Sequence, residues 1–176
     1  AINKGLKIIS GSYILFTSYN CAPHKNWVDK ILEPFFKDSQ IGVVGGEIYT
    51  LRTERDNAIE SYCEQTKFLT VGDRCGKRGG GYYPEIHHSL PHEVNGSKTC
   101  PFFATANMAV SRRAAEDIGF EFWEEPMGES VDFCLRIIKK GYKLYFQPDA
   151  IVEHMHKATP KQFYRKIWEC GFEHSL

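Results

Sequence analysis

The sequence predicts an α/β fold in which strands and helices alternate along one domain. Short apolar runs at 13–16 and 41–49, bounded by glycine or polar residues, are typical of buried strands. Between such runs, apolar residues recur three and four positions apart, as one face of a helix requires. With 176 residues, of which 42% are hydrophobic, the chain is long enough to form a core.

The first part of the chain is predicted to contain helix, strand, helix, strand and helix in turn. Gly11 ends the first helical pattern, and Asn26 is suited to cap the second helix. Pro34 predicts a kink or an early end of that second helix, because proline lacks the N–H of a helical hydrogen bond. The helices are expected at 2–9, 27–36 and 55–69, and the strands at 13–16 and 41–49.

The second part begins with residues 71–99, which are expected to form a long flexible loop. Glycine and proline recur there without a sustained period, which is typical of loops. Regular structure is then expected to resume, with Ser111 and Thr159 as helix caps. The expected strands are 102–110, 142–146 and 150–154. One helix is expected to end near Gly119, a second at Gly141, and a third to begin at Pro160.

Composition excludes several classes of function. The 22 basic and 22 acidic residues balance, so no net charge attracts nucleic acid, and no nucleic-acid partner is expected. No apolar run approaches the roughly 20 residues of a membrane span. The six cysteines include no C-x-x-C pair, which disfavours a zinc ribbon and fits reduced thiols. A cytoplasmic location is expected.

Six short segments stand out because of their order and spacing. They read AINKG at 1–5, FTSYN at 16–20, GG at 45–46, TANMA at 105–109, GESVDFCLR at 128–136 and VEH at 152–154. Together they resemble family 2 glycosyltransferases, whose pattern is A-x-N-x-G, F-x-D-x-D, G-G, T-x-N-x-A, G-E-D-x-D-x-x-x-R and V-x-H. The resemblance covers nearly the whole chain.

The resemblance implies a GT-A fold, which is a Rossmann-like mixed sheet flanked by helices. Because the chain starts at the A-x-N-x-G segment, we expect the opening nucleotide-binding half of the fold to be missing. Residues 1–176 are then a single partial GT-A domain. A partial sheet exposes an edge strand, which predicts a homodimer or a partner chain. Peripheral membrane association of the full-length protein is also expected.

The implied reaction moves a sugar from a nucleotide-diphosphate sugar to a hydroxyl of a saccharide or lipid-linked acceptor, with inversion. The implied cofactor is Mg²⁺ or Mn²⁺, held at the positions of Ser18, Asn20 and His154. The implied general base lies at Ser130, with Glu129 and Asp132 beside it. Glu129 and Asp132 either help to bind the acceptor or only favour the helix start.

Three residues are expected to contact substrate, namely Gly46, Asn107 and Trp123. For Trp123, stacking on a sugar ring and packing in the core are equally compatible with the sequence. His154 is favoured as a metal ligand over a surface histidine.

The chain departs from the family pattern where aspartates are expected. Ser18, Asn20 and Ser130 are uncharged, so a weakened metal site and a weakened base are expected. A natural pseudoenzyme or a deliberate knockout fits these departures. The alternative function is therefore a non-catalytic module that binds a glycan or a protein.

Overall fold

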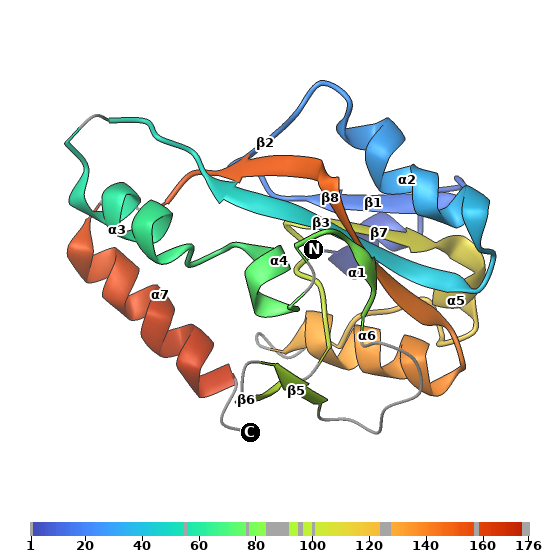
Figure 1. The fold of residues 1–176 in the computed structure, drawn as a ribbon. Helices are drawn as coiled ribbons and strands as arrows, with labels where there is room; N and C mark the ends of the chain where they lie inside the picture. Colours follow the sequence, from blue (N-terminus) through green and yellow to red (C-terminus); the bar gives the residue numbers. More distant parts are fainter. Residues whose placement is uncertain are drawn as a thin grey trace.

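The structure, a computed structural model, describes residues 2–54, 56–76, 78–83, 92–94, 97–99, 101–123, 128–156 and 159–173. The strands are β1 (Tyr13–Thr17), β2 (Cys21–Pro23), β3 (Ile41–Thr50), β4 (Gly81–Tyr82), β5 (His92–Val94), β6 (Ser97–Thr99), β7 (Asn107–Ser111) and β8 (Lys143–His154). The helices are α1 (Ile2–Leu6), α2 (Trp27–Lys37), α3 (Ala58–Thr66), α4 (Val71–Arg74), α5 (Arg112–Glu116), α6 (Glu129–Lys139) and α7 (Pro160–Glu173). Their arrangement is shown in Figure 1.

The central feature is a mixed sheet with the strand order β1-β7-β3-β8-β2, in which β4 also pairs with β8. β3 and β8 run parallel, whereas β7 is antiparallel to both of its neighbours, β1 and β3. β1, β3 and β8 therefore point the same way and end at the same edge of the sheet. In α/β folds such an edge is where ligands bind.

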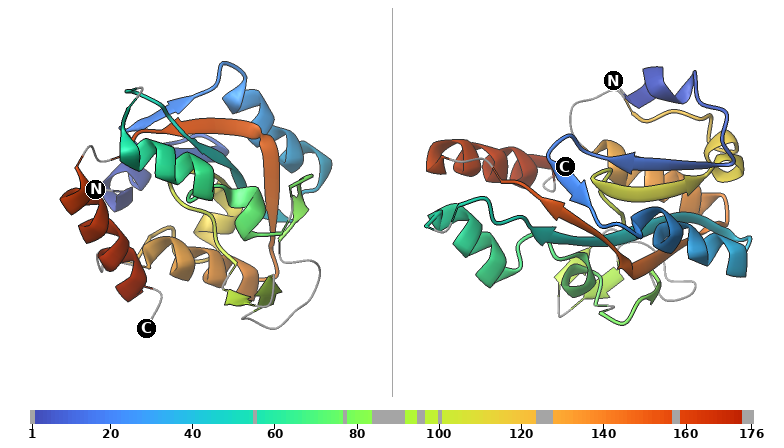
Figure 2. Two further views of the ribbon diagram at one scale, coloured as in Figure 1. Left: turned by 60° about the vertical axis from the view of Figure 1, so that its left-hand side comes forward. Right: turned by 90° about the horizontal axis from the view of Figure 1, so that it is seen from above.

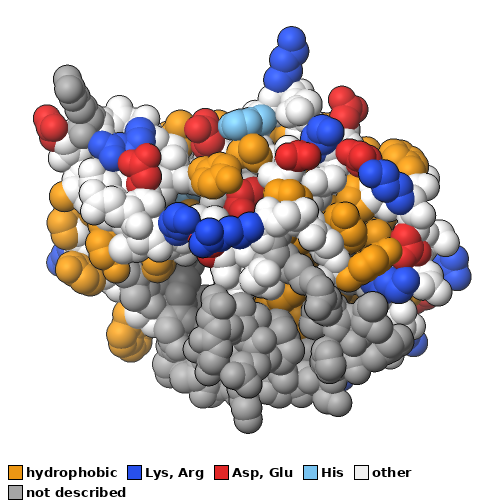
Figure 3. All heavy atoms as spheres, in the orientation of Figure 1, with side chains coloured by type: hydrophobic (Ala, Val, Ile, Leu, Met, Phe, Trp, Pro, Cys, Tyr) orange, Lys and Arg blue, Asp and Glu red, His pale blue; other side chains and the backbone are white. Residues whose placement is uncertain are grey.

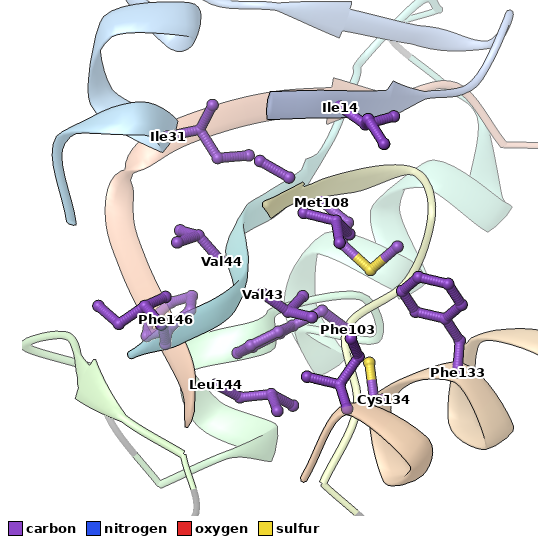
Figure 4. Close-up of a cluster of buried hydrophobic side chains, with 14 of the residues drawn as sticks. Ile14, Ile31, Val43, Val44, Phe103, Met108, Phe133, Cys134, Leu144 and Phe146 are labelled. Carbon is purple, nitrogen blue, oxygen red and sulfur yellow. The ribbon is translucent and has the colours of Figure 1, made fainter. Parts of the chain in front are cut away.

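Helices cover both faces of this sheet, with α2 on one side and α6 on the other (Figures 1 and 2). α2 buries Ile31 and Phe35, and α6 buries Phe133 and Ile137. Figure 4 shows side chains from α2, β3, β7, β8 and α6 meeting in one cluster. The apolar faces of α2 and α6 thus belong to one main core on the two sides of the sheet, while Ile59, Cys63 and Phe163 form a second, smaller cluster.

Several predicted boundaries require correction. The predicted helix 2–9 ends at Leu6, and α3 is shorter than the predicted 55–69. Pro34 does not end α2, which continues for three more residues to Lys37, and Pro34 itself is buried. Asn26 occupies the cap position of α2 but makes no cap hydrogen bond through its side chain. The predicted strand 102–110 begins only at Asn107.

The predicted flexible loop 71–99 is also corrected, as it contains α4, β4, β5 and β6. α4 forms because the carboxylate of Glu47 accepts hydrogen bonds from the backbone N–H groups of Val71 and Gly72. β4 forms because it pairs with β8. Residues 77, 84–91 and 95–96 of this loop lie outside the described residues.

The two strands predicted at 142–146 and 150–154 form one continuous strand, β8. Its register against β3 shifts between the pairs Gly46–Gln147 and Glu47–Ile151, so that β8 bulges over residues 148–150. Pro148, which has no N–H to donate, lies in this bulge, where a ladder hydrogen bond is not required. Among the described helices, none has the length and apolar character needed to cross a membrane.

Candidate active site

The turn after β1 and the end of β8 bring together two residues of the predicted metal site. β2 pairs with the end of β8, with Cys21 opposite His154. The side-chain amide of Asn20 lies 3.0 Å from Nε2 of His154, measured from Nδ2, and 3.2 Å from the backbone oxygen of Met155. Ser18 lies in the same turn, where its backbone oxygen accepts a hydrogen bond from the N–H of Cys21. The fold therefore places all three predicted residues at one sheet edge.

The Asn20 amide points its NH₂ group at Nε2 of His154. An NH₂ group can only donate, so this hydrogen bond uses Nε2 as its acceptor. In this arrangement the nitrogen that could bind a cation is directed at the amide of Asn20.

The donor set at this edge does not fit a Mg²⁺ or Mn²⁺ site. Ser18, Asn20 and His154 provide no carboxylate, whereas these cations prefer anionic oxygen ligands. Within the described ranges, no group of three or more His, Cys, Asp and Glu residues is arranged to hold a metal ion. No chemical step is therefore assigned to a metal.

The predicted catalytic residues lie in the first turn of α6. Gly128 precedes the helix with a φ of 82°, and Glu129 and Ser130 follow it, both partly exposed. The carboxylate of Asp132 accepts a hydrogen bond of 2.7 Å from Nε of Arg136, one helical turn later. Asp132 is thus engaged within the helix, while Glu129 forms no ion pair with another residue that the structure describes.

A stack of aromatic rings connects the end of β1 to the start of α6. Phe16 of β1 contacts Phe122 edge-on, with ring centroids 5.4 Å apart. Phe122 in turn stacks on Phe133 of α6, with centroids 4.1 Å apart and planes 7° from parallel. Ser18 follows Phe16 by two residues and Ser130 precedes Phe133 by three. Ser18 of the predicted metal site and Ser130 of the predicted base position thus each lie within three residues of this stack. Among the described hydrogen bonds, none joins Ser130 to Asn20 or His154.

Asn107 and Gly46, predicted to contact substrate, lie together at the bulge of β8. Asn107 is 1% exposed; its amide donates to the backbone oxygens of Glu47 and Ala150, at 2.8 and 2.7 Å, and its oxygen accepts from the indole N–H of Trp27 at 2.7 Å. A Cβ atom on Gly46 would lie 2.1 Å from the oxygen of Ala150. In this structure both residues join β3 to the bulge and make no surface available to a substrate.

The third predicted substrate residue, Trp123, is 56% exposed, so it is not a core residue. It directly follows Phe122 of the aromatic stack. Of the two interpretations left open by the sequence, core packing is thus excluded for Trp123, and sugar stacking stays a prediction.

A hollow of about 450 Å³ lies between the end of β3, α3 and α4, apart from the predicted residues. Glu47 lies in its wall, and burial raises the pKa of this carboxyl despite three backbone N–H donors. Sequence reasoning missed this hollow, because its wall joins residues from four separate segments. The wall includes His24, Tyr49, Lys67, Asp73 and Glu153.

On the face of the molecule shown in Figure 3, basic and acidic side chains are interspersed, in agreement with the balanced composition.

Comparisons with known proteins find similarity to glycosyltransferases. A sequence profile described as "Glycosyl transferase family group 2" matches residues 84–171, which is half of the chain. Two proteins of Mycobacterium tuberculosis strains, both named pre-mycofactocin glycosyltransferase, are 27% identical over 159 residues. The match covers 89% of this chain and 30% of each relative, so the chain spans less than a third of their length.

Solved structures confirm the fold. A mannosyltransferase from Pyrobaculum calidifontis, in complex with GDP-Man and Mn²⁺, superimposes with a TM-score of 0.56 at 14% identity, over 94% of this chain and 38% of the other. GalNAc-T7, solved with UDP, GalNAc and Mn²⁺, gives a TM-score of 0.52 at 16% identity, over 88% of this chain and 29% of the other. The mixed, helix-flanked sheet is the predicted GT-A fold.

Proposed function

The chain belongs to glycosyl transferase family group 2, and from this we propose that it contributes to the transfer of a sugar from a nucleotide-diphosphate sugar to an acceptor hydroxyl, with inversion. The observation that supports the proposal is the shared aromatic stack, in which Phe16 of β1, the strand that leads to Asn20, is connected through Phe122 to Phe133 of α6. A transfer site needs both parts, one for the leaving diphosphate and one for the attacking hydroxyl. Family and fold both support a transferase.

The proposed reaction is a single displacement at the anomeric carbon. The acceptor oxygen forms a bond to that carbon while the bond to the diphosphate oxygen breaks, and the hydroxyl proton passes to a base. Ser130 is uncharged near neutral pH, and Asp132 is engaged by Arg136. Glu129 is therefore the carboxylate in this turn that we assign as the base. The Asn20 amide and the His154 ring are the polar groups assigned to the diphosphate side.

The uncharged residues at positions 18, 20 and 130 favour a second candidate function. A module that binds a glycan or a protein without transferring a sugar needs the fold and the edge, but neither a base nor a metal. This candidate predicts ligand binding that is indifferent to divalent cations.

Two measurements on the chain separate the candidates. Isothermal titration with UDP and GDP, each with and without Mn²⁺, tests whether a donor site exists; binding supports the transferase. Transfer or hydrolysis of UDP- and GDP-sugars is then compared between the original protein, Glu129→Gln and Ser130→Asp. We expect Ser130→Asp to be faster and Glu129→Gln to be slower, by about 10²-fold or more in each case, as general bases contribute. Absence of nucleotide binding and of transfer in every variant would reject the transferase in favour of the binding module.

A further inference from the structure

The segment Ile118–Trp123, which connects α5 to the region before α6, has an unusual backbone. Phe120 has a φ of 54° and Gly119 a φ of 93°. The left-handed region is open to glycine but strained for a bulky residue such as phenylalanine. Such strain persists only where the surroundings fix the segment, and it is common at functional sites. Ile118–Trp123 is held by side chains from two helices, α6 and α1.

Arg136 of α6 holds this segment from one side. Its guanidinium donates to the backbone oxygens of Ile118 and Glu121, at 2.9 and 2.8 Å, on either side of the strained Phe120. The third nitrogen of the guanidinium, Nε, donates to the carboxylate of Asp132 at 2.7 Å, which fixes the plane of the guanidinium group. A lysine could not make this arrangement, because all three N–H donors of its ammonium lie on one nitrogen, without the planar spread of a guanidinium.

Asn3 of α1 holds the segment from the other side. Its amide donates to the backbone oxygen of Phe122 and its oxygen accepts from the backbone N–H of Phe122, both at 2.8 Å. This reciprocal pair satisfies both backbone groups of one residue, as a neighbouring strand would. The ring of Phe122 is at the same time stacked on Phe133 and is 3% exposed. Backbone and side chain of Phe122 are thus both fixed.

The next residue, Trp123, is 56% exposed. Its indole offers a flat apolar surface with one polar edge. The backbone that leads to it loses little conformational freedom when a ligand binds, because that backbone is already held at Phe122.

We infer that Asn3 and Arg136 are positioning residues, which hold Ile118–Trp123 so that Trp123 presents a preformed stacking surface to the ring of an acceptor saccharide. This inference rests on the proposed transferase function, because it assigns the acceptor side of that site. It gives a role to two residues of the sequence pattern, Asn3 and Arg136, for which no contact with a substrate is needed.

The first test measures, without any ligand, how firmly Asn3 holds the backbone of Phe122. Amide hydrogen exchange at Phe122 is followed in the original protein, in Asn3→Ala and in Asn3→Asp, which keeps the acceptor oxygen but loses the donor. We expect rapid exchange in Asn3→Ala and retained protection in Asn3→Asp. Unchanged protection in Asn3→Ala would overturn the role of Asn3.

The second test measures saccharide binding and its dependence on Trp123, Asn3 and Arg136. Methyl glycosides of glucose, mannose, galactose and N-acetylglucosamine are titrated by saturation-transfer NMR against the original protein, Trp123→Ala, Asn3→Ala and Arg136→Lys. Arg52→Lys is the matched control, because Arg52 is also ion-paired to a carboxylate, that of Glu64, and its side chain is 34% exposed against 28% for Arg136. We expect loss of binding in Trp123→Ala, and about fivefold weaker binding in the other two variants, the factor for one hydrogen bond of ordinary net strength. Arg52→Lys should bind normally.

Two outcomes separate this inference from the proposed function. Saccharide binding that depends on Trp123, Asn3 and Arg136, without transfer in any variant, would keep the stacking surface and reject the transferase. Transfer that persists while these three variants bind saccharides as the original protein does would keep the transferase and overturn the inference. An original protein that binds none of the glycosides would also overturn it. Circular dichroism of each variant confirms that the fold is retained.

Discussion

Asn20 and His154 are joined by a hydrogen bond of 3.0 Å between Nδ2 and Nε2, although 134 residues separate them in the chain. The pairing of β2 with the end of β8 makes this contact possible, because it places Cys21 opposite His154. The bond lies at the edge where three strands end. An aspartate at position 20 would instead present a carboxylate to the same ring.

Asn20→Asp is therefore expected to create affinity for Mn²⁺. A carboxylate is a preferred ligand of this cation, whereas the Asn20 amide offers it only a neutral oxygen. Changes in the surroundings of metal ligands alone alter affinity about 10- to 100-fold, so a gain of at least about tenfold is expected from a new ligand. Titration of free Mn²⁺ by electron paramagnetic resonance measures it.

The control for this change is Asn26→Asp, which adds the same charge at an exposed position before α2. Equal Mn²⁺ affinity in Asn20→Asp and Asn26→Asp would show that position 20 has no part in a metal site.

Asn107→Ala is expected to lower the free energy of unfolding by about 3 kcal/mol, since it leaves a buried indole N–H and two backbone oxygens without their partner. Urea denaturation followed by fluorescence measures this loss. Asn26→Ala, which removes an asparagine without a side-chain cap bond, should change stability by less than about 0.5 kcal/mol. Similar values for the two variants would contradict the role given to Asn107 at the bulge.

Gly46→Ala is expected to destabilise the fold by about 1–3 kcal/mol or more, because the new methyl group would overlap the oxygen of Ala150 and the amide of Asn107. Gly5→Ala is the matched control. Gly5 lies in α1, and a Cβ there would meet no atom within 4 Å. This second change should be neutral or stabilise by up to about 1 kcal/mol, as helix propensity predicts. The midpoints of thermal unfolding of both variants decide whether close approach is the reason for the glycine.

Glu47 is expected to make stability depend on pH in the opposite sense to a salt-bridged carboxylate. Burial raises the pKa of Glu47, so the folded protein binds this proton more tightly than the unfolded chain does. The resulting stability is fully present below the unfolded pKa and is lost as pH rises through the folded pKa. Glu47→Gln should remove this loss, because glutamine does not titrate.

The measurement is the free energy of unfolding in urea from about pH 4 upward, the range in which carboxyl groups of glutamate begin to titrate. Glu54→Gln, at an exposed glutamate, is the control and should keep the pH dependence of the original protein. If the free energy of unfolding changes with pH in the same way for Glu47→Gln and for the original protein, burial of Glu47 does not make stability depend on pH.

The sequence was informative where a local pattern has a single structural solution. The apolar run at 41–49 predicted β3, and Ser111 and Thr159 were correctly expected to cap helices, since their side chains accept from Ala114 and Gln162. The order of six short segments led to the GT-A fold. Local sequence failed for α4 and β4, because these elements depend on Glu47 and on β8, which are distant in the chain.

For the candidate site, the sequence by itself determined which residues stand at the positions of interest and that three of them are uncharged. It could not determine what those residues touch. Only the tertiary structure decided that Asn20 meets His154, that Asn107 and Gly46 are committed to the bulge of β8, and that Asn3 and Arg136 hold Ile118–Trp123. The reason is physical. Residue type fixes which hydrogen bonds and charges are available, whereas strand pairing and packing between distant segments fix which partner each group finds.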